Sequence, residues 1–201
     1  VVKLIFVMRV LGTTSLAKFV KLTNTGTATL NISNIGISGD FAISAKTCGS
    51  TVAAGASCTL SVTFTPTAIG TRTASLTFTD DASPATQTVT LTGVGTAISL
   101  APTSLNFGTV AVGTTSAAKS ITVHNAGTLT VTFTGFSIAG TNPGDFLISG
   151  NTCGSSIAGG ASCTVSTKFK PTATGTRKGT LRVADNGGGS PQTAALTGTG
   201  Q

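Results

Sequence analysis

Residues Thr47–Asp80 read TCGSTVAAGASCTLSVTFTPTAIGTRTASLTFTD, and residues Thr152–Asp185 read TCGSSIAGGASCTVSTKFKPTATGTRKGTLRVAD. The two stretches are identical at 20 of 34 aligned positions, at a constant offset of 105 residues. A match of this density indicates one structural unit that is present twice. Because 201 residues suffice for two domains of about 100 residues each, we predict a first domain over residues 1–95 and a second over residues 96–201.

Apolar and polar residues alternate inside the repeated stretch. Leu60, Val62 and Phe64 fall on one face of an extended chain, which is the pattern of a half-buried strand. Pro66 cannot donate to a ladder and marks the strand end, and Gly70 favours the turn that follows. About seven such short strands per repeat, separated by turn residues, predict an all-β chain of two tandem Ig-like antiparallel β-sandwich domains.

Cysteines occur twice in the pattern Cys-x9-Cys, around a connection rich in Gly, Ala and Ser. The four are Cys48, Cys58, Cys153 and Cys163. Two cysteines that close a short loop, in both copies, predict one local disulfide per repeat, which would contribute about 2–3 kcal/mol each. A structural zinc needs four ligands, the single histidine has no counterpart in the first repeat, and redox pairs are usually closer together, as in Cys-x-x-Cys. We therefore expect disulfides, no metal and no cofactor, in a protein that is secreted or displayed at the cell surface.

The composition makes several classes of function improbable. The net charge of +7 is spread evenly, with six basic and three acidic residues in 1–96 and six basic and two acidic residues in 97–201. Because the chain also has no Trp or Tyr on which bases could stack, we do not expect nucleic-acid binding. The longest apolar run is far below the roughly 20 residues that a membrane-spanning helix needs.

Catalytic chemistry is not expected either. An enzyme needs convergent acid, base or nucleophilic groups, and five aspartates and one histidine offer few of them. Asp80-Asp81 and Asp185-Asn186 follow equivalent strands, where Asp and Asn favour local turns. A calcium site would require more oxygen ligands nearby.

The N-terminal segment Val1–Val10 resembles a signal-peptide remnant but aligns better with the first strand of the second repeat. Leu4 and Phe6 match Leu105 and Phe107 at an offset of 101, so we predict a strand whose inner face carries Val2, Leu4, Phe6, Met8 and Val10. Since first-strand and last-strand motifs occur in both copies, each copy is expected to be a complete domain, with Gly93–Ala97 as a short linker that places the domains end to end. Because the chain begins without Met, we take it as mature, processed or excised.

Two outer positions of that strand are apolar only in the first repeat. Ile5 and Val7 stand where the second repeat has Asn106 and Gly108. An apolar outer pair on an edge strand is unfavourable in water. We expect a neighbouring domain or subunit to cover Ile5 and Val7, which makes them candidate assembly contacts.

A second candidate surface is basic and belongs to the second repeat only. Lys168, Lys170 and Arg182 are expected on outward positions of adjacent strand segments, with Arg177 and Lys178 in the turn between them. These residues could bind an acidic polysaccharide or a partner surface. The competing interpretation is that they serve solubility and edge protection.

The second repeat carries a combination of motifs that resembles a known group. The motifs are Ser104-Leu105-Asn106-Phe107-Gly108, Val112-Gly113-Thr114-Thr115-Ser116, Asn125-Ala126-Gly127, Cys153…Cys163, Phe169-Lys170-Pro171 and Gly175. The chain, over nearly its whole length and twice, resembles the bacterial ASPM/SPD-2/Hydin-like (ASH) repeats of choice-of-anchor D domain proteins. The resemblance implies Ig-like β-sandwiches that serve as structural or adhesive modules in secreted or surface-anchored proteins, with no shared catalytic residues. The first repeat departs from the pattern at Val7 and lacks the lead-in seen at Ala101-Pro102-Thr103.

These observations lead to two functional hypotheses outside enzymology. The first is an extracellular structural module, either part of a cell-surface stalk or the subunit of a self-assembling filament. Its partners would be neighbouring repeats or further copies of itself, joined head to tail or by strand addition. The alternative is an adhesion module that binds an acidic glycan or a protein through the basic face of the second repeat.

Overall fold

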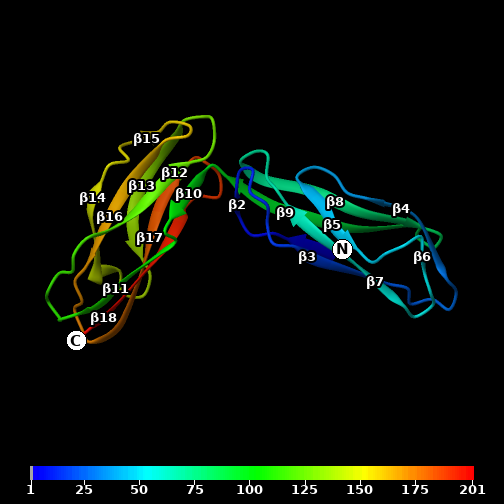
Figure 1. Cartoon of the computed structure of the whole chain (residues 1–201), viewed down its shortest axis with the longest axis horizontal. Coiled ribbons are helices and arrows are strands. Elements are labelled where there is room, and N and C mark those ends of the chain that lie inside the picture. The colour runs from blue at the N-terminus through cyan, green and yellow to red at the C-terminus, as the bar shows by residue number, and fades with distance from the viewer. Residues whose placement is uncertain (1) are drawn as a thin grey trace. The chain divides into compact units, whose positions relative to one another are not determined.

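The computed structural model describes residues 2–201, which form two compact units divided after Gly95 (Figure 1). Both units consist of β-strands, and the only helical segment among the described residues is the 3₁₀ turn η1 (Pro143–Asp145). Each unit contains two sheets. The predicted all-β fold of Ig-like sandwiches is confirmed.

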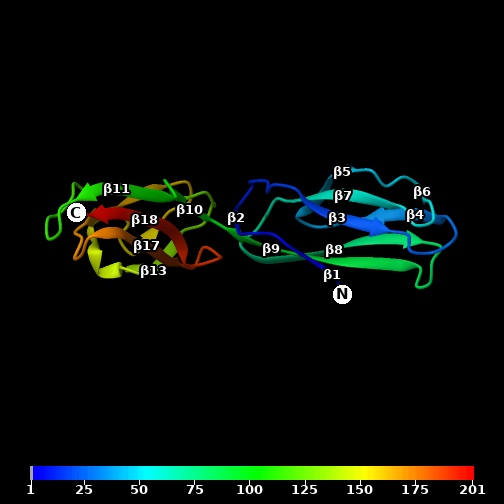
Figure 2. The same ribbon diagram turned by 90° about the horizontal axis from the view of Figure 1, so that it is seen from below.

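The first domain packs a larger sheet against a three-stranded one. The larger sheet has the order β1 (Val2–Ile5), β9 (Thr86–Thr96), β8 (Gly70–Asp80), β4 (Leu30–Gly36) and β6 (Thr51–Val52), with β2 (Arg9–Val10) also paired to β9. The smaller sheet has the order β3 (Lys18–Thr23), β7 (Ser57–Phe64) and β5 (Phe41–Lys46). Figure 2 shows β8 and β9 in one layer and β5 and β7 in the other. β1 runs parallel to β9, whereas β8 pairs antiparallel with both β9 and β4, β4 with β6, and β7 with both β3 and β5.

The second domain repeats this plan with one strand more in its smaller sheet. Its larger sheet has the order β11 (Ser104–Val110), β18 (Gln192–Gly200), β17 (Gly175–Asp185), β13 (Val131–Ala139) and β15 (Ser156–Ile157). Its smaller sheet has the order β10 (Ile98–Ala101), β12 (Lys119–Asn125), β16 (Ser162–Phe169) and β14 (Phe146–Asn151). The additional strand is β10, which pairs antiparallel with β12.

The core follows from the alternation in the sequence. Leu60, Val62 and Phe64 of β7 are fully buried, as predicted, and Phe64 stacks on Phe41 with ring centroids 4.8 Å apart. The chain passes very close to this ring, because a Cβ added at Gly93 would lie 2.5 Å from Phe64 Cε1. This close approach explains the glycine in the repeated Leu-Thr-Gly ending of each domain.

The predicted disulfides are also confirmed. Cys48 is bonded to Cys58, and Cys153 is bonded to Cys163, each across ten positions of sequence. In the first domain the bond joins the segment after β5 to β7, and both sulfur atoms belong to buried residues. Each domain therefore has its own covalent link within the smaller sheet.

The first strand differs from its predicted form. Leu4 and Phe6 point inward, but Val2 and Met8 are exposed, and the strand is interrupted between β1 and β2. In the second domain β11 continues through a bulge at which Gly108 has a φ of +71°. A β-branched residue disfavours such a φ, so Val7 at this position leaves the strand of the first domain in two pieces.

The expectation about the linker needs correction. Most of the predicted linker is strand, because Gly93–Thr96 lie in β9 and Gly95 pairs with Gly70 of β8. The two domains also differ at one edge. Among residues 2–201, no strand occupies the place beside β3 that β10 occupies beside β12.

Candidate functional site

An open groove lies along the uncovered side of β3 in the first domain. It has a volume of about 530 Å³. It runs between β3 and the paired ends of β8 and β9, with Val2 of β1 also on its wall. Its apolar lining consists of Val2, Val20, Leu22, Leu30, Phe78 and Val89.

The equivalent space in the second domain is filled by β10. Ile98 and Leu100 of this strand are 1% and 9% exposed, and they stand opposite Asn125 and Val123 of β12. At the offset of 101 the corresponding residues of the first domain are Asn24 and Leu22, and both line the groove. Within residues 2–201, the groove therefore occupies the position that β10 fills in the second domain.

Side chains along the groove are more accessible than their counterparts. Leu22 and Leu30 are only half-buried, whereas Val123 and Val131 are buried. The difference follows directly from the absence of a covering strand. Among the described residues, this edge of the first domain is therefore more accessible than the equivalent edge of the second.

Polar groups at the end of the groove depend on the same strand. In the second domain the backbone N–H of Ala97 donates to Gly187 O at 2.7 Å, and Gln192 Nε2 donates to Thr96 Oγ1 at 3.1 Å. In the first domain the equivalent Gln87 donates to Pro84 O at 2.6 Å. The incoming strand of the second domain is therefore held by side-chain and backbone hydrogen bonds as well as by apolar packing.

A buried aspartate closes the turn beside the groove in each domain. Asp80 Oδ1 accepts from Ala82 N–H at 3.0 Å, and Asp185 Oδ1 accepts from Gly187 N–H at 2.7 Å. Burial raises the pKa of Asp185, and the hydrogen bonds from Gly187 and Gln192 offset only part of that effect. In both aspartates the second carboxylate oxygen is buried without a hydrogen-bond partner.

The candidate assembly contacts lie outside the groove. Ile5 is 62% exposed and Val7 is 69% exposed, so the predicted outer position of both side chains agrees with the structure. Phe19, on the outer side of β3, is 70% exposed and has Ser120 as its counterpart. The N-terminal edge of the first domain is consequently more apolar than the equivalent edge of the second.

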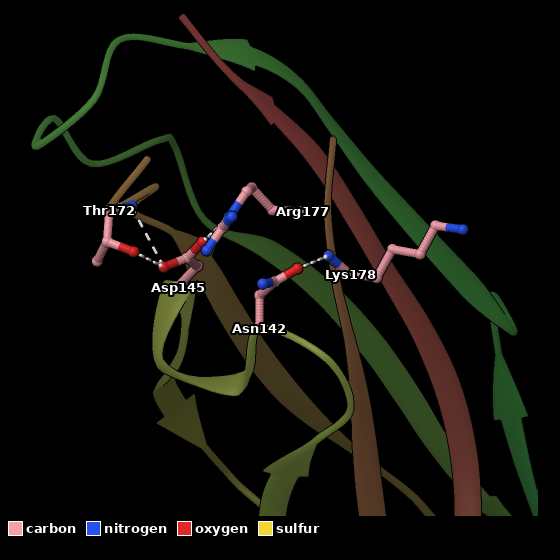
Figure 3. Close-up of polar contacts among 5 residues, drawn as sticks. All are labelled: Asn142, Asp145, Thr172, Arg177 and Lys178. Carbon is pink, nitrogen blue, oxygen red and sulfur yellow. Dashed lines mark hydrogen bonds and ion pairs between the residues drawn. The ribbon is translucent and has the colours of Figure 1, made fainter. Parts of the chain in front are cut away.

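An ion pair near the start of β8 is repeated near the start of β17. Arg72 Nε donates to Asp40 Oδ2 at 2.6 Å, and Thr67 Oγ1 donates to Asp40 Oδ1 at 2.7 Å. In the second domain Arg177 pairs with Asp145 in the same way, and Thr172 Oγ1 donates to Asp145 at 2.6 Å (Figure 3). These contacts hold the strand ends of opposite sheets together.

Hydrogen bonds decide the pKa of these two carboxyl groups. Burial by itself would raise the pKa of Asp40 and of Asp145. The hydrogen bonds from Thr67 and Thr172, followed by those from the two arginines, outweigh burial and hold each pKa below its ordinary value. Both aspartates are thus charged and structural at neutral pH.

The five basic residues predicted as an anion-binding patch are not brought together. Lys168 is on β16, and Lys170 follows that strand directly, whereas Arg177, Lys178 and Arg182 are on β17 in the other sheet. The expected adjacency of these strand segments does not hold in space, because β16 and β17 belong to opposite sheets. Arg177 is already paired with Asp145, and the Lys178 side chain extends away from that pair (Figure 3).

The second repeat has four residues more than the first, around Thr141–Gly144, and this loop is anchored to β17. Asn142 N–H donates to Lys178 O at 2.8 Å, and Lys178 N–H donates to Asn142 Oδ1 at 3.0 Å. These two bonds, one of which Figure 3 shows, seat the turn η1 on β17. The added residues therefore lengthen a surface loop without opening the core.

Residues 2–201 offer neither a metal-binding cluster nor a membrane-spanning helix. These residues contain no cluster of three or more His, Cys, Asp or Glu side chains that could hold a metal ion. No helix of the described chain is long and apolar enough to cross a membrane.

Family models match both domains. The model described as Abnormal spindle-like microcephaly-associated, ASPM-SPD-2-Hydin (ASH) matches residues 96–193. The model described as HYDIN/CFA65/VesB-like, Ig-like domain matches residues 9–94. Together they support an ASH/Ig-like family for the two repeats and, with it, a non-catalytic binding or structural module.

Solved structures with a similar chain path come from several organisms. The Vibrio cholerae protease VesB shares 21% identity over 51% of this chain with a TM-score of 0.41, and the chain covers 32% of the length of VesB. The ASH/PapD-like domain 7 of human CEP192 shares 17% identity over 53% of this chain and 86% of its own, with a TM-score of 0.40. The secreted V. cholerae serine protease VesC shares 13% identity over 84% of this chain and 45% of its own, with a TM-score of 0.39. No curated protein matches the chain in sequence.

Proposed function

We propose that this chain is a non-catalytic, extracellular structural module of a cell-surface stalk or a self-assembling filament. The observation that carries the proposal is that the acidic side chains are engaged in structural hydrogen bonds. All five aspartates of the chain accept hydrogen bonds that organise their own domain. Such carboxylates are committed to structure and are poorly suited to acid–base catalysis.

The two disulfides support the extracellular part of the proposal. Disulfides persist in oxidising compartments, and both domains have one. Each would stabilise its domain by restricting a short loop in the unfolded chain. This suits a module that must remain folded outside the cell, without chaperones.

Assembly would use neighbouring repeats or further copies of the chain. The exposed apolar pair Ile5 and Val7 favours contact with another domain or subunit along the N-terminal edge. Head-to-tail packing and strand addition are both compatible with such an edge.

The alternative, adhesion to an acidic glycan or a protein through the basic face of the second repeat, has weaker support. Lys168 and Arg182 lie on different sheets, and Arg177 is neutralised by Asp145. A bound polyanion would contact only some of the five basic residues at the same time.

The proposal can be tested on native cells that produce the protein. Free thiols would be blocked with an alkylating reagent under denaturing conditions at the moment of lysis, and in a parallel sample the protein would be labelled on intact cells with an antibody against the second domain. We expect surface labelling, four unmodified cysteines, and rods or filaments of successive sandwiches by electron microscopy in non-reducing buffer. Alkylated cysteines, or labelling only after permeabilisation, would contradict an extracellular module.

A further inference from the structure

We propose that the groove beside β3 binds one extended strand of the β10 type, supplied by the chain that leaves the last strand of a neighbouring repeat. The inference rests on the proposed function, because it names the segment through which the module would join an array. The occupant is identified from inside the molecule. In the second domain the equivalent groove is filled by β10, whose Ile98 and Leu100 are buried.

The register of the missing strand can be stated residue by residue. In the second domain Ile98, Ser99, Leu100 and Ala101 stand opposite Asn125, His124, Val123 and Thr122. At the offset of 101, the counterparts of these four β12 residues in the first domain are Asn24, Thr23, Leu22 and Lys21. All four line the groove. An incoming strand would therefore run antiparallel to β3 over these four positions.

The lining defines the sequence that the strand must have. Two aliphatic side chains two residues apart would enter between the sheets, as Ile98 and Leu100 do, against Leu22, Leu30 and Phe78. The residue between them would face outward, where Ser99 is partly exposed. A strand with an aliphatic-polar-aliphatic pattern meets both requirements.

The edge of β3 offers backbone groups as well as apolar surface. An edge strand presents a row of N–H and C=O groups that can pair with another chain. Added strands gain affinity from this main-chain pairing and specificity from alternate side chains in pockets. A compact small molecule would use the apolar lining but leave that row unpaired.

The supplier follows from the connectivity of the second domain. There, the chain leaves β9 at Thr96 and, after the single residue Ala97, becomes β10. The strand that completes one domain is thus the exit of the last strand of the domain before it. By the same rule, the exit strand of a neighbouring repeat would complete the first domain.

The test adds this strand to the full 201-residue chain. The six residues of Thr96–Ala101, TAISLA, are placed directly before Val1, so that their spacing to β1 matches the spacing of β10 to β11. The control carries the same six residues in the order TIALSA, which moves both aliphatic side chains to the opposite face. Hydrogen exchange of the β3 amides that point away from β7 is then measured in both proteins.

We expect the TAISLA extension to slow exchange of those amides by about tenfold or more relative to the TIALSA control, because it pairs their N–H groups and buries two aliphatic side chains. The second domain, whose sequence is unchanged, serves as the folding control. Equal exchange in the two extended proteins would overturn the groove assignment. That result would leave the cysteine and surface-labelling tests of the proposed function untouched, so the two ideas can fail separately.

Discussion

The two domains share their interiors but differ at their N-terminal edges. The fully buried Leu60, Phe64 and Leu91 have the buried counterparts Val165, Phe169 and Leu196. The edges differ. The first domain has an open groove beside β3 and exposed Ile5 and Val7 side chains. In the second domain β10 fills the equivalent groove, and the residues that correspond to Ile5 and Val7 are polar or small. Repetition has kept what folds each domain and changed what each domain presents to a partner.

If the interiors are equivalent, matched truncations should have matched effects. Leu91→Ala and Leu196→Ala each remove a fully buried side chain of the last strand. We expect each to lower the free energy of unfolding of its own domain by about 3 kcal/mol, within the usual range of 2–5 kcal/mol. Chemical denaturation followed by domain-resolved NMR signals would measure both, and a much smaller effect in one domain would break the equivalence.

Removing either disulfide should have the next largest effect. The paired variants are Cys48→Ala with Cys58→Ala, and Cys153→Ala with Cys163→Ala. Because each bond closes a loop of the same length, we expect a loss of about 2–3 kcal/mol in each domain. Thermal unfolding in non-reducing buffer is the measurement. The wild-type protein under reducing conditions should lose both disulfides and therefore show the loss of stability in both domains.

The repeated ion pair gives a pH-dependent comparison. Both Asp40 and Asp145 have a pKa lowered below the ordinary value, so the unfolded chain takes up protons first as the pH falls. The stability from these carboxylates is therefore present above about pH 5 and lost as the pH falls below about 4, through the folded pKa values.

Asp40→Asn and Asp145→Asn should each cost roughly 1–2 kcal/mol at pH 7, as expected for hydrogen bonds to a charged group. The same substitutions should flatten the acid limb of the stability curve of the affected domain. Urea denaturation between pH 2.5 and pH 7 would detect this. An unchanged acid limb in either variant would show that the pair does not govern acid sensitivity there.

The smallest effect on stability is expected at the exposed apolar pair. Ile5→Ser with Val7→Ser should change the free energy of unfolding by less than about 0.5 kcal/mol, because both side chains are largely in solvent. If this edge is an assembly contact, the variant should lose self-association in analytical ultracentrifugation while the second domain is unaffected. The polar counterparts Asn106 and Gly108 make the second domain the internal control. Self-association as strong as that of the wild type would remove Ile5 and Val7 from the interface.

The sequence predicted the interior well because alternation and repetition report directly on burial. Leu60, Val62 and Phe64 proved to be core, and the spacing of the cysteines predicted both disulfides. Sheet membership was harder to predict. Lys168 and Arg182 are close in sequence but lie on different sheets. The chain crosses from one sheet to the other between β16 and β17 but stays in one sheet between β17 and β18, and periodicity does not distinguish the two cases.

The open groove was missed for a related reason. First-strand motifs are present in both repeats, and they do not show the difference at this edge. The informative segment is Thr96–Pro102, in which Ile98 and Leu100 alternate with the small residues Ala97, Ser99 and Ala101. Only the register of β10 on β12 shows that this segment is a strand of the sandwich.

The most direct measurement of the difference between the edges is hydrogen exchange on the unmodified protein. It compares the amides of residues 21–24 that point away from β7 with the corresponding amides of residues 122–125, which face β10. Fast exchange in the first set and strong protection in the second is the predicted result. Equal protection of the two sets would show that the first domain closes this edge by itself, and would contradict an edge left open for a partner strand.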